Sequence, residues 1–203
     1  MSTLVKQIPF DWKQKSILDG RGYHVDIGAF STPIVGGGNG TAFDQDQPEG
    51  VISVPSGTTI IPIRIGVQCQ VPLLAADANE VEILIAADIA AAHTANATTP
   101  PTSETALKLY VGHPKESLCT CYSASTANST NPTLGLELAH KVITADKQNT
   151  PVTALWGDLE LLYEPEVGNL LVGPCALYVY WGGTVATSGF AQIEWLEFLT
   201  SDL

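Results

Sequence analysis

The chain has 203 residues, a formal net charge of −12 at pH 7, and a charged fraction of only 15%, against about a quarter in typical domains. Its basic residues are scattered, so they cannot form the positive stripe that displaces counterions from DNA or RNA, and we expect no direct contact with nucleic acid. Asp11 and Asp19 interrupt the densest basic group, which comprises Lys6, Lys13, Lys15 and Arg21. No apolar run reaches the roughly 18 to 20 residues that span a bilayer.

Residues 1–50 are predicted to form an N-terminal arm and a flexible loop. Residues 1–24 lack sustained periodicity, and residues 1–14 lack the apolar centre of a secretory signal. They include an aromatic patch that a disordered tail would not need, so we expect the arm to dock on another surface; the patch is Ile8, Pro9, Phe10 and Trp12. Three consecutive glycines, Gly36 to Gly38, and the polar run 44–48 indicate the loop. Residues 51–203 are predicted to form one domain.

From Val51 to Leu199 the chain is a series of about eight segments that alternate apolar and polar residues, as β-strands with one buried face do. The predicted strands are 51–54, 58–71, 80–89, 105–112, 134–142, 153–164, 175–181 and 189–199, with 118–123 as a short further candidate. In the third segment Ile89 is expected to point inward and Asp88 outward. The connections are long and few are Asn-Gly or Asp-Gly turns, which favours an all-β, two-sheet Greek-key sandwich over a meander.

Two positions in this series predict irregular pairing. Pro62 lacks a backbone N–H, so it predicts an edge position or a β-bulge in the segment 58–71. The adjacent apolar pair Trp195 and Leu196 interrupts the alternation of the last segment. One inserted residue would restore the phase, so we expect a β-bulge at this pair.

The four cysteines do not form the pattern of a disulfide framework. Cys119 and Cys121 are two residues apart in a strand-like run, so they project from one face with poor geometry for a disulfide. Cys69 and Cys175 lie on apolar stripes and are expected to be small core residues. This usage favours a reducing compartment.

Two groups of residues resemble metal sites incompletely. Asp44, Asp46 and Glu49 could offer oxygen ligands to Ca²⁺, but the remaining ligands of a calcium loop are absent, and a solvated acidic loop is the better interpretation. A zinc site would need His113 with Cys119 and Cys121, yet these cysteines follow a strand pattern rather than a zinc knuckle; the residue His140 is expected to be a hydrogen-bonded core or interface histidine.

The catalytic candidates are equally incomplete. His24 and Asp26 could orient one another, but no nucleophilic elbow of the form Gly-x-Ser-x-Gly occurs. Glu160 and Glu164 could act as the paired carboxylates of a glycosidase, although outward carboxylates on a strand are normally its solvated face. We therefore expect no catalytic, metal-binding or cofactor-binding residue, no cofactor and no enzymatic activity.

Three aromatic residues lie opposite the aliphatic stripes of their strands: Trp156, Tyr178 and Tyr180. If these faces are exposed, they form an adhesive surface that contacts partners or ligands. The alternative is that both faces of these strands are packed as parts of one core.

Four stretches resemble the single-jelly-roll major capsid proteins of icosahedral bacterial and archaeal viruses. The stretch Val54-Pro55-Ser56-Gly57-Thr58-Thr59-Ile60-Ile61-Pro62 is similar to the entry of the first strand of the roll. The stretch Leu171-Val172-Gly173-Pro174, followed by Leu177-Tyr178-Val179-Tyr180-Trp181-Gly182 and Gly189-Phe190-Ala191, is similar to the last two strands. The resemblance covers residues 51–199.

The resemblance implies an eight-stranded antiparallel jelly roll and a structural subunit that self-assembles into an icosahedral shell. It also implies a location in the virion of a bacteriophage or related virus, assembly in the host cytoplasm, and contacts with other copies and other capsid proteins. The Arg-rich arm of small RNA-virus coats is absent, which suits a shell separated from its genome by an internal membrane or by other proteins. The alternative is a carbohydrate- or receptor-binding jelly-roll module that uses the exposed aromatics.

Overall fold

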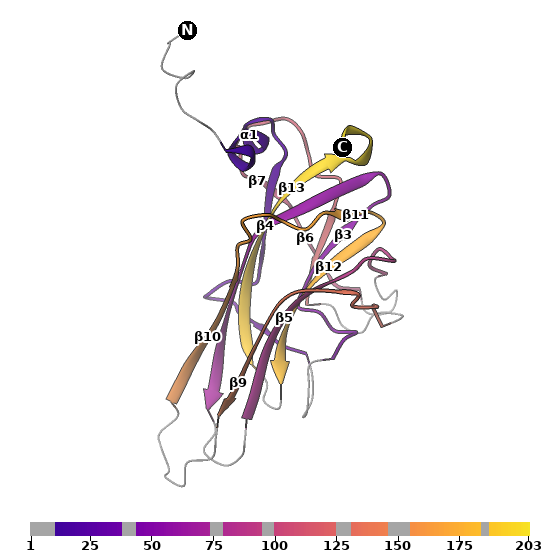
Figure 1. The fold of residues 1–203 in the computed structure, drawn as a ribbon. Helices are drawn as coiled ribbons and strands as arrows, with labels where there is room; N and C mark the ends of the chain where they lie inside the picture. The colour runs from indigo at the N-terminus through magenta and orange to yellow at the C-terminus, as the bar shows by residue number, and fades with distance from the viewer. Residues whose placement is uncertain are drawn as a thin grey trace.

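The computed structural model describes residues 11–37, 44–73, 79–94, 100–124, 131–145, 155–183 and 187–203, and it is mostly antiparallel strands in two sheets that form an all-β sandwich (Figure 1). One sheet has the order β10 (Leu155–Tyr163), β4 (Thr58–Leu73), β13 (Ser188–Leu199), β1 (Gly22–Ile27) and β7 (Leu107–Lys108). Two short strands extend it, with β11 (Leu171–Val172) on β4 and β2 (Ile34–Val35) on β13.

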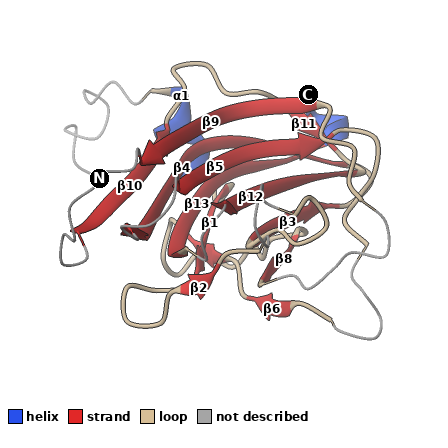
Figure 2. Cartoon of the chain, turned by 90° about the horizontal axis from the view of Figure 1, so that it is seen from below, coloured by secondary structure: helices blue, strands red, loops and turns tan. Residues whose placement is uncertain are grey.

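The second sheet has six strands in the order β6 (Thr102–Glu104), β8 (Thr120–Ser123), β3 (Gly50–Val54), β12 (Cys175–Gly183), β5 (Asn79–Asp88) and β9 (Leu136–Ala145). Helix α1 (Trp12–Leu18) precedes the sandwich, and a 3-10 turn (Thr200–Asp202) follows it. At one side of the sandwich the edge strands β9 and β10 approach each other (Figure 2), and the Lys141 amine donates a hydrogen bond to the Glu160 carbonyl. No helix in the described ranges has the length and apolar character needed to cross a bilayer.

The main core lies between the two sheets, where alternate residues of facing strands interdigitate. Its largest members, Trp181 from β12 and Trp195 from β13, are fully buried. Cys69 and Cys175 belong to this core as predicted, and all four cysteines are unpaired and buried. Burial of this apolar surface is the dominant stabilising contribution to the fold.

The predicted arm boundary at residue 50 is wrong for residues 22–27, because these residues form β1 in the interior of the seven-stranded sheet. Strand β1 pairs with β13 on one side and with β7 on the other. Tyr23, Val25 and Ile27 alternate along it and are each at most 1% exposed. Its residues alternate apolar and polar as a strand does, but the alternation spans only six residues and was therefore missed in the sequence. Predicted arm residues Lys6, Ile8, Pro9 and Phe10, and the loop glycine Gly38, lie outside the described residues.

Helix α1 is a second element that the sequence pattern did not predict. Its capping box forms at Asp11, whose carboxylate accepts a hydrogen bond of 2.7 Å from the Gln14 backbone N–H, while the Gln14 side chain accepts one from the Asp11 backbone N–H. The helix has only seven residues and buries none of them fully. It is therefore held by its contact with the sheet rather than by its own propensity.

The bulge that the sequence predicts near Trp195 and Leu196 lies on the partner strand. The register between β13 and β4 shifts between Glu194 and Trp195. These two residues pair with Arg64 and Pro62, so Ile63 of β4 is the extra residue. Strand β13 keeps its alternation, with Trp195 facing the core and Leu196 the outer face. Both are buried because the outer face is covered here as well. Pro62 is next to the bulge, in the gap between the segments of β4 that pair with β10 and with β11.

Three finer predictions for single strands are also wrong. Asp88 is buried rather than outward, because its carboxylate accepts hydrogen bonds from the backbone N–H groups of residues 90, 91 and 133 at 2.9 to 3.2 Å. Ile89 is 58% exposed rather than inward, because β5 ends before it. Of the predicted strand 105–112 only Leu107–Lys108 forms, and Val111 is 87% exposed.

Candidate functional site

The outer face of the six-stranded sheet is closed by the chain itself. Tyr178 and Tyr180 of β12 are almost fully buried in a second apolar cluster, which also contains Val51, Leu84, Ala86 and Ala176. The Tyr180 hydroxyl donates a hydrogen bond of 2.9 Å to the Gln45 carbonyl. These two tyrosines therefore form no exposed platform, and they belong to a cluster separate from the main core; Trp156 lies in β10, but its side chain is outside the described residues.

His93 completes this cover. Its ring lies against Tyr122 and Tyr178, with ring centroids 5.4 and 5.9 Å apart. Burial lowers the pKa of His93 to about 4 and raises the pKa of Tyr178 well above its usual value. Both side chains are therefore neutral near pH 7, as an apolar cover requires.

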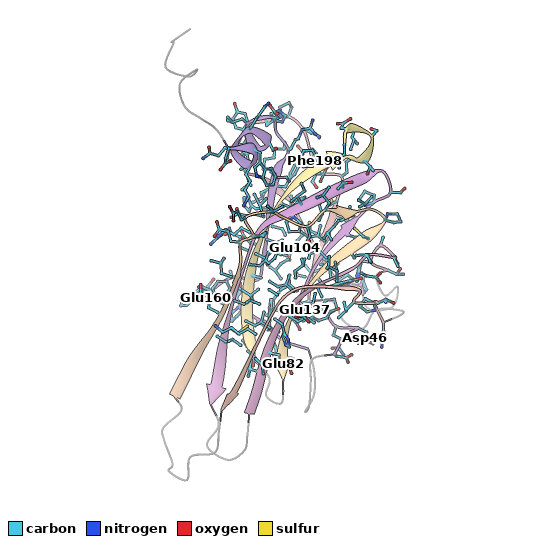
Figure 3. The ribbon with its side chains drawn as sticks, in the orientation of Figure 1. Asp46, Glu82, Glu104, Glu137, Glu160 and Phe198 are labelled. Atoms are coloured by element: carbon cyan, nitrogen blue, oxygen red, sulfur yellow. The ribbon has the colours of Figure 1, made fainter. Side chains whose placement is uncertain are left out.

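The outer face of the seven-stranded sheet has a covered half and an open half. Under α1, Ile61, Ile63 and Leu196 are buried, and Ile17, Leu109 and Phe198 pack on them. Figure 3 shows Phe198 at the end that carries α1 and Glu160 on the flank of β10, away from that end. The covered half is thus confined to one end of the sheet.

The open half contains a shallow hollow of about 140 Å³, which we call the Gly66 hollow. Its lining comes from three adjacent strands: Arg64, Gly66 and Gln68 of β4, Glu160 and Leu162 of β10, and Phe190 and Gln192 of β13. Strand pairing places Gly66 directly between Leu162 and Gln192. In the same way Gln68 lies between Glu160 and Phe190. A glycine at the centre of this grid creates the depression.

Polar side chains along one wall of the hollow hold each other in place. The Gln192 amide donates to Asp26 at 3.2 Å and accepts a hydrogen bond of 2.9 Å from the Arg64 guanidinium. The same guanidinium nitrogen lies 3.2 Å from a Glu194 carboxylate oxygen. The Arg64 charge is thus neutralised within the wall, and Glu160 and Asp26 leave the surroundings negative.

Two apolar side chains flank the hollow from opposite sides. Leu162 on β10 is 50% exposed. On β13 the half-buried Phe190 ring makes an edge contact with Phe30, which is 77% exposed, at a centroid distance of 6.4 Å. The hollow is therefore amphipathic, since its lining combines amide and charged groups with aliphatic and aromatic ones.

Figure 1 shows α1, β7, β11 and the C-terminus at one end of the sandwich. Exposed apolar residues belong to these segments and to the loops that adjoin them. Contacts at this end connect segments that are distant in sequence. The Lys13 amine donates a hydrogen bond of 2.8 Å to the Pro165 carbonyl, and the Arg21 guanidinium lies over the Phe198 ring. We call the following residues the apolar end: Trp12, Leu18, Leu107, Tyr110, Val111, Leu118, Val167, Leu170, Val172, Leu199 and Leu203. Patches of this kind mark surfaces that contact other molecules.

The calcium candidate is not assembled from its three predicted residues. Asp44 and Asp46 share a turn, in which the Asp44 carboxylate accepts hydrogen bonds from the Gln47 amide and the Asp46 backbone N–H. Glu49 points away into the sandwich, where it is 2% exposed and accepts hydrogen bonds from the backbone N–H groups of Gly37 and, at 2.8 Å, Trp181. Burial raises the pKa of the Glu49 carboxyl to about 8, so it is largely protonated near pH 7.

The zinc candidate is also not assembled. Cys119 and Cys121 are in the main core, where burial raises their thiol pKa values, that of Cys121 to about 12. His113 lies in a turn against Tyr110, and its ring accepts a hydrogen bond from the Lys115 backbone N–H. Within the described ranges no three metal-ligating side chains are grouped.

Of the remaining candidates, Asp26 and Glu160 flank the Gly66 hollow on the outer face of the seven-stranded sheet. Asp26 binds the Gln192 amide, and His24 lies two residues before it on β1. Glu160 borders the Gly66 hollow, whereas Glu164 lies beyond the end of β10. His140, expected to be a hydrogen-bonded core or interface histidine, is exposed and lies 3.1 Å from a Glu82 oxygen. A register shift between Ile85 and Ala86, where β5 pairs with β9, changes which residues of β9 share a face and so alters the phase predicted for His140.

The Gly66 hollow was missed by sequence reasoning. Its one local signal is a glycine at a polar position inside a strand, since the other walls come from strands distant in sequence. Comparison with protein-family models, with curated proteins and with solved structures finds no significant match for this chain.

Proposed function

We propose that this chain is a structural capsid subunit, built on an eight-stranded jelly roll, that assembles with copies of itself into an icosahedral shell. The eight longest described strands support the jelly roll. Taken in chain order from one to eight, they are β1, β3, β4, β5, β9, β10, β12 and β13. They pair first with eighth, second with seventh, third with sixth and fourth with fifth, as in a long antiparallel ribbon rolled around a core.

The observation that carries the shell proposal is the apolar end. Val111 and Val167 are 87% and 83% exposed, on two segments that are distant in sequence. Leaving such side chains in water is unfavourable. Burying them against another protein surface would contribute about 25 cal/mol of stabilisation per Å² of apolar surface removed from water. Because the end comprises several separate segments, it offers a broad contact surface rather than a pocket for a small ligand.

The net charge of −12 supports a shell that does not bind its genome directly. In this proposal other capsid proteins or an internal viral membrane separate the subunits from the nucleic acid, and the shell is part of a bacteriophage-like virion assembled in the host cytoplasm. The N-terminal arm then comprises only the residues before β1.

The test is assembly of the purified chain, measured by light scattering on gel filtration and by electron microscopy for closed particles. We expect oligomers or particles, and Val111→Asp and Val167→Asp should shift the population toward monomer by at least tenfold. Both positions are exposed, so neither substitution should unfold the chain.

Val35→Asp is the matched control. Val35 is 62% exposed but lies on β2, which pairs with the start of β13, far from the apolar end. It should assemble as the unsubstituted chain does. A chain that stays monomeric at high concentration, or particles that form equally well in the Val111→Asp and Val167→Asp variants, would contradict the proposal.

A further inference from the structure

Gly66 is not explained by the internal packing of the protein. A Cβ atom built on it would meet no heavy atom within 4 Å, and its backbone is ordinary extended strand rather than a conformation that requires glycine. Glycine inside a strand costs stability, and it often marks a place where a ligand approaches the backbone closely. The open space above Gly66 therefore points to something outside the chain.

The size of the Gly66 hollow limits the ligand. A cavity of about 150 Å³ accommodates one benzene ring, so about 140 Å³ is room for one six-membered ring. It is well below the roughly 300 to 1,000 Å³ of pockets that enclose larger molecules. A ligand in this hollow therefore inserts one ring and leaves the remainder in solvent.

The chemistry of the walls limits it further. The space above Gly66 is bordered by the amides of Gln68 and Gln192 and by the Arg64 guanidinium, while Leu162 and Phe190 flank it from opposite sides, on β10 and β13. A pyranose ring matches this lining, because its hydroxyl groups exchange hydrogen bonds with amides and guanidinium while the C–H groups of its faces pack on apolar side chains.

The charges favour a neutral ring over an anionic one. Arg64 is already paired with Glu194, and the carboxylates of Glu160 and Asp26 lie on either side of the hollow. An anion would thus meet net negative potential in addition to the charge of −12 on the whole chain.

We propose that the Gly66 hollow on the outer face of the seven-stranded sheet binds one pyranose ring of a neutral glycan. Gly66 provides the space, Gln68, Gln192 and Arg64 bind the hydroxyl groups, and Leu162 and Phe190 contact C–H groups of the ring from opposite sides. The hollow is shallow and open, so the affinity for a single ring is about millimolar, and a multivalent shell would raise the total avidity.

The experiment is saturation-transfer NMR with the methyl pyranosides of glucose, galactose, mannose and N-acetylglucosamine. The full chain is used, and the method works on monomers and on particles alike. We expect transfer to at least one pyranoside. Gly66→Leu places a side chain in the hollow, where its Cβ meets no heavy atom within 4 Å, and should reduce the transfer at least tenfold, with no loss of thermal stability. Leu162→Ser removes one of the two apolar side chains at a half-exposed position and should reduce the transfer several-fold.

Thr120→Leu is the matched control, since it places leucine on an exposed strand position of the other sheet and should bind as the unsubstituted chain does. No transfer to any of the four pyranosides, or transfer that survives Gly66→Leu, overturns the glycan site. Loss of assembly in Gly66→Leu without any pyranoside binding also overturns it, and would assign the hollow to a contact between copies. Failure of the shell proposal is distinguishable, because sugar binding to a monomer would stand without particles.

Discussion

The outer faces of the two sheets differ in how far the chain itself covers them. On the six-stranded sheet, β12 is buried along its whole length, and Tyr178 and Tyr180 pack under segments of the same chain. On the seven-stranded sheet the middle of β4 presents Arg64, Gly66 and Gln68 to an open hollow. A face covered by its own chain contributes to stability, whereas a face left open and polar is available for binding. Substitutions on the two faces should therefore differ most in their effect on unfolding.

The largest difference is expected between Tyr180→Ala and Gln68→Ala. Tyr180 is fully buried, so removing its ring should lower the free energy of unfolding by about 3 to 5 kcal/mol. Gln68 is exposed, and its substitution should change that free energy by about 0.5 kcal/mol or less. Urea unfolding measures both. Tyr180→Phe should cost about 1 kcal/mol through the lost bond to Gln45. Equal costs for the two alanine variants would show that the covered face is not packed.

A second expected difference concerns pH. Burial raises the pKa of Glu49 from 4.5 to about 8, so between these values the folded chain holds a proton that the unfolded chain releases. The stability that protonated Glu49 provides is fully present below about pH 4.5, declines as the pH rises, and is lost above about pH 8. Its slope cannot exceed about 1.4 kcal/mol per pH unit.

Glu49→Gln has no ionised form and should remove this decline. Urea unfolding from pH 5 to 9 tests it, with Glu137→Gln on the exposed surface of β9 as the matched control. The free energy of unfolding of Glu137→Gln should parallel that of the unsubstituted chain at every pH. If Glu49→Gln also runs parallel, the buried carboxyl does not control the alkaline stability.

The cover at the end of the seven-stranded sheet should be weaker than the cover on the other sheet, because α1 buries none of its residues fully. Asp11→Ala removes the N-cap bond to Gln14 and should cost about 1 kcal/mol, confined to this helix. Hydrogen exchange of the amides of residues 14–18 should rise several-fold while exchange in β12 stays unchanged. Asp19→Ala at the other end of the helix is the control and should have a smaller effect, since only its backbone N–H is used for capping. Equal exchange in both variants would refute the capping role.

The burial of both faces of β12 could be predicted in part from the sequence. The run Ala176 to Trp181 contains no polar interruption, and a continuous apolar run is typical of a strand buried on both faces. Strict alternation would instead indicate one solvated face, and the sequence alone left open whether the face that carries the tyrosines is exposed or packed. The adjacent apolar residues Trp195 and Leu196 predicted a bulge wrongly for the same reason. Both faces of β13 are covered there, so two neighbouring residues are apolar although β13 itself has no bulge.

The open face could not be assembled from the sequence. Alternation gave the bounds of β4 and β13 to within a few residues and placed Gly66 on the polar face. It could not give the neighbours Leu162 and Gln192, because pairing between distant strands depends on the topology of the whole sandwich. Strand β1 was missed for a related reason, since six residues gain their stability from β13 and β7 rather than from their own pattern.

The smallest effect is expected for the ion pair of the open face. The Arg64 and Glu194 side chains are 40% and 21% exposed, so solvent screens their attraction and ordering two long side chains offsets part of it. Glu194→Gln keeps a hydrogen-bond acceptor for the guanidinium and should change the free energy of unfolding by about 0.5 kcal/mol or less, with the difference shrinking as salt is added. A double-mutant cycle with Arg64→Met isolates the pair. A coupling above about 1 kcal/mol that persists in high salt would mean that the wall is a structural network rather than a prearranged binding surface. In that case the contrast between a covered face that stabilises and an open face that binds would fail at the wall of the Gly66 hollow.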